Sequence, residues 1–81
     1  MEIQVKLYAS LRKFGPKGLS IGEAFAVHGQ SGWTIADLVN SLNIPLESAK
    51  IVMVDGIHRK LDFALPDSPV LVAIFPPIGG G

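Results

Sequence analysis

The sequence predicts an α+β roll in which one main helix crosses over a mixed β-sheet. Apolar and polar residues alternate at the start of the chain, as in a strand with one buried face. A helical spacing of apolar residues follows in the middle, and two continuous apolar runs come after it. Because the helix stands between a pair of strands and the later strands, we expect the first and last strands to lie side by side at the centre of the sheet.

The first two strands are predicted before the helix. Ile3, Val5 and Leu7 alternate with polar residues and predict a strand at the start of the chain. Glycine and proline then mark segment 10–18 as a turn or loop. A second strand is expected over about residues 19–28, with a bulge at its internal glycine.

The helix is expected to begin after Thr34, whose hydroxyl suits an N-cap position. Asp37 can reach back toward Thr34, as the third residue of a capping box does. Pro45 either ends this helix or begins a separate turn over 45–49. The expected apolar face has residues spaced three and four apart, namely Ile35, Leu38, Val39 and Leu42.

The second half of the chain predicts further strands. The run "IVMV" at 51–54 is typical of a central strand buried on both faces. Asp55 and Gly56 form a strong turn signal, and "LPDSP" at 65–69 indicates another turn. The run "VLVAIF" at 70–75 predicts the last strand, which leads directly into "PPIGGG". The sequence therefore predicts a folded domain that ends with this strand and a projecting tail after it.

Composition limits the class of protein. The chain has 81 residues, enough for one domain, which we place at 1–75 with the tail at 76–81. It is 48% hydrophobic and 17% charged, which argues against disorder. Seven basic residues balance seven acidic ones, so no net charge attracts the chain to nucleic acid or an anionic membrane. We expect neither as a partner.

Cysteine and targeting signals give further exclusions. The chain has no cysteine, which excludes disulfides, thiolate nucleophiles and cysteine-ligated metal sites. Its start does not have the basic and then apolar pattern of a signal peptide, and no apolar run approaches the roughly 20 residues of a membrane span. The expected location is the cytoplasm.

No set of side chains has the spacing of a catalytic or metal site. His28 and His58 are far apart and lack a third ligand at metal spacing. The carboxylates are scattered, and the serines lack a Gly-x-Ser-x-Gly context. "GPKG" and "GQSG" lack the spacing of a phosphate-binding loop. We therefore expect no catalytic residue, bound metal or bound cofactor in this chain.

The tail is the most informative segment. Pro76 and Pro77 fix φ and favour an extended geometry, so they would project the tail away from the domain. Gly79, Gly80 and Gly81 have no Cβ and could pass through a narrow channel. Six residues at roughly 3.3 Å each reach about 20 Å. A disordered terminus is the alternative, but a thin arm that ends in a carboxylate suits a substrate presented to an enzyme.

Over essentially its whole length the chain resembles the MoaD/ThiS family of ubiquitin-like sulfur carriers, which are small β-grasp proteins. "IQVKLYASLRKFGP" is similar to the family's first strand and loop, "TIADLVNSL" to its helix, and "IVMVDGIH" to its central strand. "LPDSPVLVAIFPPIGGG" resembles the last strand and glycine terminus and is the most specific stretch. Asp55 stands where asparagine is usual, and Ser68-Pro69 replaces a common Gly-Asp. The resemblance implies a ubiquitin-like β-grasp roll with a flexible C-terminal tail.

The resemblance also implies a chemistry for Gly81. A ubiquitin-activating-type adenylyltransferase, using ATP and Mg²⁺, would adenylate its carboxylate, and sulfide or a persulfide would then displace AMP to leave a thiocarboxylate. "IFPPIGGG" favours the small-subunit branch of molybdopterin synthase, whose large subunit would receive the tail. Phe75, Tyr8 and His58 match positions that relatives use to dock partners, although core packing or cover of a strand edge would equally explain Phe75 and Tyr8.

Three alternatives remain open from the sequence. The chain could carry sulfur to a thiazole synthase for thiamine, or to another sulfur-requiring pathway, instead of to the molybdenum or tungsten cofactor. It could be a protein modifier that is joined to lysines through Gly81. It could also be a β-grasp interaction domain with an inert tail.

Overall fold

Five strands form one mixed sheet in the computed structural model, which describes residues 1–78. The tail residues Gly79, Gly80 and Gly81 lie outside the described residues. The strands are β1 (Glu2–Leu7), β2 (Phe25–His28), β3 (Ile51–Val54), β4 (Ile57–His58) and β5 (Val70–Phe75). The helices are α1 (Ile35–Ser41) and two 3₁₀ helices, η1 (Ala9–Phe14) and η2 (Leu46–Ser48).

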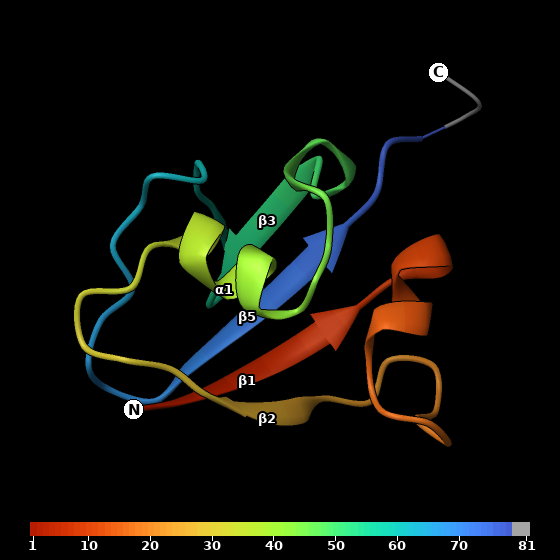
Figure 1. Ribbon diagram of the computed structural model, residues 1–81, viewed down its shortest axis with the longest axis horizontal. Helices are drawn as coiled ribbons and strands as arrows, with labels where there is room; N and C mark the ends of the chain where they lie inside the picture. Colours follow the sequence, from red (N-terminus) through yellow and green to blue (C-terminus); the bar gives the residue numbers. More distant parts are fainter. Residues whose placement is uncertain (79–81) are drawn as a thin grey trace.

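The first and last strands lie together at the middle of the sheet, as predicted. The strand order is β2-β1-β5-β3-β4, and β1 and β5 run parallel from the pair Ile3 and Val70 to the pair Leu7 and Ile74. The other neighbouring strands are antiparallel. Helix α1 connects β2 to β3 and crosses one face of the sheet (Figure 1). The predicted α+β roll is therefore confirmed.

The core lies between α1 and the sheet. Residues of β1 and β5 alternate strictly between buried and less buried positions, so one face of each strand packs under the helix. The stripe predicted on the helix is also confirmed, since its first three residues are completely buried and Leu42 packs against them. The residues with no exposed surface are Ile3, Val5, Ile35, Leu38, Val39, Val72 and Ile74.

The helix begins as predicted and ends earlier than Pro45. The Asp37 N–H donates to Thr34 Oγ1 at 3.3 Å, and Asp37 Oδ2 accepts from the Thr34 N–H at 2.9 Å, which completes a capping box. The helix stops at Leu42, because Asn43 takes a left-handed conformation with φ of 62°. The turn expected over 45–49 is present as η2.

The second strand is shorter than predicted. Only β2 (Phe25–His28) is extended, because the preceding residues form a closed turn. The Glu23 N–H donates to the Ser20 carbonyl at 3.0 Å, and the Ser20 N–H donates to Glu23 Oε1 at 2.9 Å. Gly22 has φ of 79°, which a turn requires and a regular strand does not allow. The predicted bulge is wrong, and this glycine belongs to a turn.

Two other expectations need correction. Strand β3 is not buried on both faces, since Val52 and Val54 are buried while Ile51 and Met53 are half-buried. The reason is that α1 covers only one face of the sheet, so even β5, which is the central strand, is buried on that face alone. The predicted loop at 10–18 also contains most of η1, whose start at Ala9 no glycine or proline marks.

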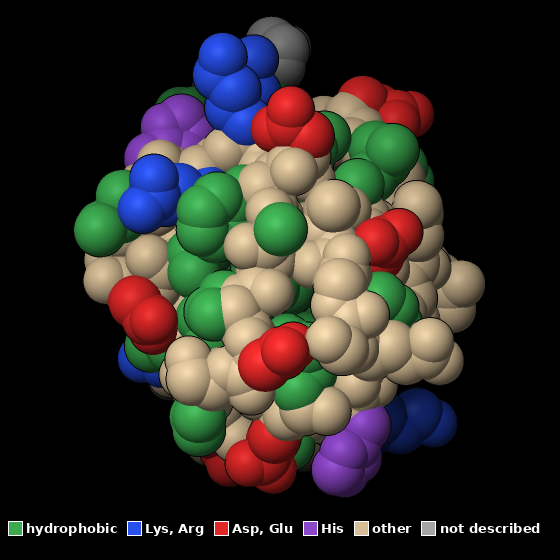
Figure 2. All heavy atoms as spheres, turned by 90° about the vertical axis from the view of Figure 1, so that its left-hand side faces the viewer, with side chains coloured by type: hydrophobic (Ala, Val, Ile, Leu, Met, Phe, Trp, Pro, Cys, Tyr) green, Lys and Arg blue, Asp and Glu red, His purple; other side chains and the backbone are tan. Residues whose placement is uncertain are grey.

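The charged side chains are dispersed over the surface, in keeping with the balanced formal charge of the chain. Figure 2 shows acidic and basic side chains spread over one face, with neither sign forming a continuous field. Within residues 1–78, no helix combines the length and apolar character that crossing a membrane requires.

Candidate functional site

The end of β5 is held by backbone hydrogen bonds on both sides. The Tyr8 N–H donates to the Ile74 carbonyl at 3.2 Å, and the Lys50 N–H donates to the Phe75 carbonyl at 2.9 Å. Pro76 and Pro77 follow, and neither has an N–H to continue these ladders. The chain therefore leaves the sheet immediately after Phe75, and residues 76–78 extend beyond the end of β5 (Figure 1).

Two aromatic rings stack beside the point where the tail leaves. The ring centroids of Tyr8 and Phe75 are 4.4 Å apart, and the ring planes differ by only 10°. Both side chains are half-buried. A stacked pair of this kind contributes about 0.5–1.5 kcal/mol beyond the burial of its area. The stack therefore joins the end of β5 to the residue that precedes η1.

The backbone after Tyr8 keeps that ring in place. The Tyr8 carbonyl accepts a hydrogen bond from the Leu11 N–H at 3.1 Å, and this bond closes the first turn of η1. Ala9 has φ of 52°, a left-handed conformation that sharply redirects the chain after β1. Leu11 is buried in the core, so η1 anchors this turn to the domain.

An open hollow of about 360 Å³ lies at the base of the tail. Ile78 is 86% exposed, so a large apolar side chain stands free just before the glycines. Among the lining side chains only Tyr8 carries a polar group, so the hollow offers no acid and base pair and suits apolar contact. We call it the tail-base hollow, and its lining residues are Tyr8, Ala9, Ile51, Phe75, Pro76, Pro77 and Ile78.

The structure brings together only part of the predicted docking surface. Tyr8 and Phe75 are in direct contact, as described above. His58 pairs with Met53 in the edge strand β4 and lines a different hollow. Gly79, Gly80 and Gly81 lie outside the described residues, so the structure describes the tail only as far as Ile78.

Sequence reasoning missed three residues of this hollow, namely Ala9, Ile51 and Ile78, the last of which was expected only as part of the tail. Ile51 faces it because the register of β3 and β5 pairs Ile51 with Phe75. A correct strand register would have found Ile51, since paired residues of antiparallel strands share a face. No sequence signal marks Ala9, whose position depends on the start of η1.

Within the described part of the chain, no group of three or more His, Cys, Asp or Glu side chains could hold a metal ion. The exposed His28 and His58 lie at opposite edges of the sheet, on β2 and β4.

Solved structures share this arrangement over almost the full chain. SAMP1 from Haloferax volcanii superposes with a TM-score of 0.71 and 21% identity, and the match covers the whole of both chains. A candidate molybdopterin converting factor, subunit 1, from Pyrococcus furiosus superposes with a TM-score of 0.68 and 21% identity, over 95% of this chain and 98% of that one. The chain has the ubiquitin-like β-grasp fold.

A third match extends this result. The Haloferax volcanii HVO 2177 protein superposes with a TM-score of 0.70 and 20% identity, over 100% of this chain and 87% of that one. The β-grasp fold that the resemblance implies is therefore confirmed, and the neighbours also include a small archaeal modifier protein from Haloferax volcanii. No protein-family model matches the chain, and no curated protein matches it by sequence.

Proposed function

We propose that this chain is a sulfur carrier whose terminal residue, Gly81, is converted to a thiocarboxylate by partner enzymes. The observation that carries the proposal is the way the central strand ends. Strand β5 is fixed on both sides up to Phe75, Pro76, Pro77 and Ile78 then line an apolar hollow, and three glycines follow in the sequence. The sheet holds the start of this arm in a fixed position, and in this proposal the carboxylate at its end is the group on which another protein acts.

The proposed chemistry has two steps. A carboxylate is a poor electrophile, so an oxygen of the Gly81 carboxylate first attacks the α-phosphorus of ATP and pyrophosphate leaves. Hydrosulfide then attacks the carbonyl carbon of the acyl adenylate, AMP leaves with the original oxygen, and the hydrosulfide proton is released. The product is a thiocarboxylate, whose soft sulfur is a better nucleophile than an oxygen. ATP, Mg²⁺ and the sulfur donor come with the activating enzyme, and this chain supplies the end group.

The domain and tail have separate roles in this proposal. Tyr8 and Phe75 form an apolar surface against which the activating enzyme docks. Pro76 and Pro77 stiffen the start of the tail, and the glycines after Ile78 let the end enter an active site. His58 lies outside the tail-base hollow, so we propose the docking surface without it.

The first experiment measures the mass of the intact chain. Incubation with its cognate activating enzyme, MgATP and sulfide should raise the mass by the difference between sulfur and oxygen. Omitting ATP should prevent the change, as should deletion of Gly80 and Gly81. An unchanged mass, with an enzyme shown to release pyrophosphate in the same mixture, would count against the proposal.

We further propose that the acceptor is the large subunit of molybdopterin synthase. The likeness in fold to a candidate molybdopterin converting factor supports this branch. The test is whether the thiocarboxylated chain restores molybdopterin synthesis to an extract that lacks its own small subunit. Restoration of thiazole synthesis in its place would assign the chain to the thiamine branch.

A second candidate function is protein modification, in which activated Gly81 is joined to lysine side chains of other proteins. The likeness in fold to a small archaeal modifier protein favours considering it. An N-terminally tagged chain should then give a ladder of conjugates on immunoblots, and the ladder should vanish when Gly80 and Gly81 are deleted. If neither conjugation nor sulfur transfer depends on these residues, the tail is inert and the chain is an interaction domain.

A further inference from the structure

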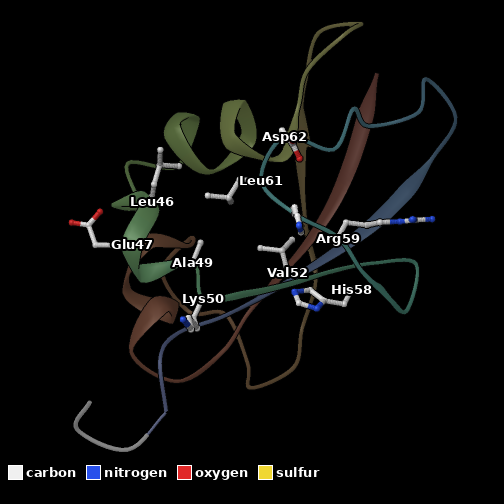
Figure 3. A pocket seen from close by; sticks show the side chains of 10 residues that line it. Leu46, Glu47, Ala49, Lys50, Val52, His58, Arg59, Leu61 and Asp62 are labelled. Atoms are coloured by element: carbon white, nitrogen blue, oxygen red, sulfur yellow. The ribbon is translucent and has the colours of Figure 1, made fainter.

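A second hollow, of about 620 Å³, lies near the start of β3. It shares no lining residue with the tail-base hollow. It is formed by η2, by β3 and by the segment that follows β4 (Figure 3). The function proposed above does not use it. We call it the basic groove, and its lining residues are Leu46, Glu47, Ala49, Lys50, Val52, His58, Arg59, Lys60, Leu61 and Asp62.

The floor of the basic groove is apolar. Ala49 and Val52 belong to the core at 5% and 2% exposure and form its base. Leu46 and Leu61 lie across from each other above that base (Figure 3), and Leu46 is 37% exposed. An aliphatic side chain placed between these leucines would be removed from water on several sides, which favours its binding.

The rim of the groove is predominantly basic. Lys50, Arg59 and Lys60 are exposed there, against the two carboxylates of Glu47 and Asp62. Figure 3 shows the Glu47 carboxylate directed away from the hollow. Since the whole chain has zero formal charge, a basic excess at one groove is a local feature.

The two lysines are the groove's available cations. No side-chain hydrogen bond within residues 1–78 involves Lys50, Arg59 or Lys60. The Arg59 guanidinium lies over the Phe63 ring at 4.6 Å from its centroid, so that residue is held by its own chain. Lys50 and Lys60 remain to pair with carboxylates of a ligand.

We propose that the basic groove binds an acidic segment of another protein that carries a large aliphatic side chain. The aliphatic side chain fills the space between the two leucines, and flanking carboxylates pair with Lys50 and Lys60. The lining residues include no Phe, Tyr or Trp ring on which a nucleic-acid base could stack, and the chain has no net positive charge to attract phosphates, which favours a peptide over a nucleic acid.

The groove and the tail-base hollow are lined by consecutive residues but lie on opposite faces of β3, since Val52 pairs with Ile74 and Ile51 pairs with Phe75. Lys50 lines the groove, and its N–H donates to the Phe75 carbonyl at 2.9 Å. The next residue, Ile51, lines the tail-base hollow. The proposal that the groove binds an acidic segment therefore does not depend on the proposed sulfur-carrier function or on the protein that holds the tail.

The test is a titration of the complete ¹⁵N-labelled chain with three blocked peptides of equal length. The first has two leucines flanked by aspartate and glutamate, the second has lysines in place of the acidic residues, and the third has serines in place of the leucines. The first should shift the amide resonances of residues 46–52 and 58–62 and bind about tenfold more tightly than the others. Raising the salt concentration should weaken that binding, because the paired charges are near solvent.

A matched pair of double variants locates the site. Lys50→Glu with Lys60→Glu should lose most of the binding of the acidic peptide. Lys13→Glu with Lys17→Glu makes the same change in charge at exposed positions on and after η1, and it should bind like the parent chain. All four side chains are exposed, so both double variants should fold, as a far-UV circular dichroism spectrum can verify.

Several results would overturn the proposal. One is that the lysine peptide binds as tightly as the acidic peptide, and another is that the resonance shifts lie outside the groove. The others are that both double variants lose the same amount of binding to the acidic peptide, or that no peptide binds. Shifts of groove resonances with rising concentration of the chain alone would identify a second copy as the occupant and reject an acidic partner segment. If the peptide fails to bind while the mass assay detects the thiocarboxylate, the groove proposal falls and the proposed function stands.

Discussion

The two faces of β5 show how one short strand serves both the fold and the proposed partner contact. Val70, Val72 and Ile74 face α1 and are 3%, 0% and 0% exposed. The alternating residues Leu71, Ala73 and Phe75 lie on the opposite face and remain half-buried. Since α1 covers one face of the sheet, the same strand is fixed in the core on that side and accessible on the other. Changes on the helix side should therefore alter stability, and changes on the open side should alter binding.

The largest effect on stability is expected at Ile74, the last core residue before the tail. Ile74→Ala should lower the free energy of unfolding by about 2–5 kcal/mol, because it leaves a cavity at a fully buried site. Urea denaturation followed by circular dichroism measures this loss. Leu71→Ala, on the open face of the same strand, is the control and should cost clearly less. Equal losses would mean that the two faces do not differ as described.

Phe75 should separate stability from binding. Phe75→Ala removes the stack with Tyr8 and part of a half-buried ring, so we expect a loss of about 1–2 kcal/mol in the free energy of unfolding. Binding to the activating enzyme should weaken by about tenfold or more, as when an aromatic anchor of an interface is truncated. Isothermal titration calorimetry with the purified enzyme measures the second effect. Normal binding by the folded variant would remove Phe75 from the docking surface.

A change at the N-cap of α1, on the helix side of the sheet, should lower stability without altering partner binding. Thr34→Ala removes the hydroxyl that accepts from the Asp37 N–H and should lower the free energy of unfolding by about 1 kcal/mol. Binding to the activating enzyme should not change, because Thr34 does not line the tail-base hollow. Thermal melts and the same calorimetry test both statements. A loss of binding at this site would show that the helix side also contacts the partner.

The parts of the fold that short-range rules determine could be predicted from the sequence. Alternation in 2–7 and 70–75, the capping box at Thr34 and the Asp55-Gly56 turn each depend on neighbouring residues. Asp55 has φ of 49° and Gly56 φ of 85°, the positive values that a tight hairpin needs. These features follow directly from pattern and turn chemistry.

The features that were missed depend on longer-range packing. The apolar run of β3 does not show that only one helix covers the sheet, so its burial on both faces was overestimated. The segment before β2 reads as a strand until the reciprocal bonds of Ser20 and Glu23 are known. The separation of His58 from Phe75 likewise depends on the order of strands in the sheet.

The smallest effect is expected at the Tyr8 hydroxyl, and it tests what kind of contact the open side makes. This hydroxyl takes part in no hydrogen bond among residues 1–78, so Tyr8→Phe keeps the stacked ring and should change the free energy of unfolding by less than about 0.5 kcal/mol. Enzyme binding should stay close to that of the parent chain, while Tyr8→Ala should weaken it as Phe75→Ala does. If Tyr8→Phe alone weakened binding to that extent, the partner would be reading a polar group. The tail-base hollow would then be a hydrogen-bonding site in place of an apolar one, and the difference between the two faces of β5 would lie in polarity as well as in exposure.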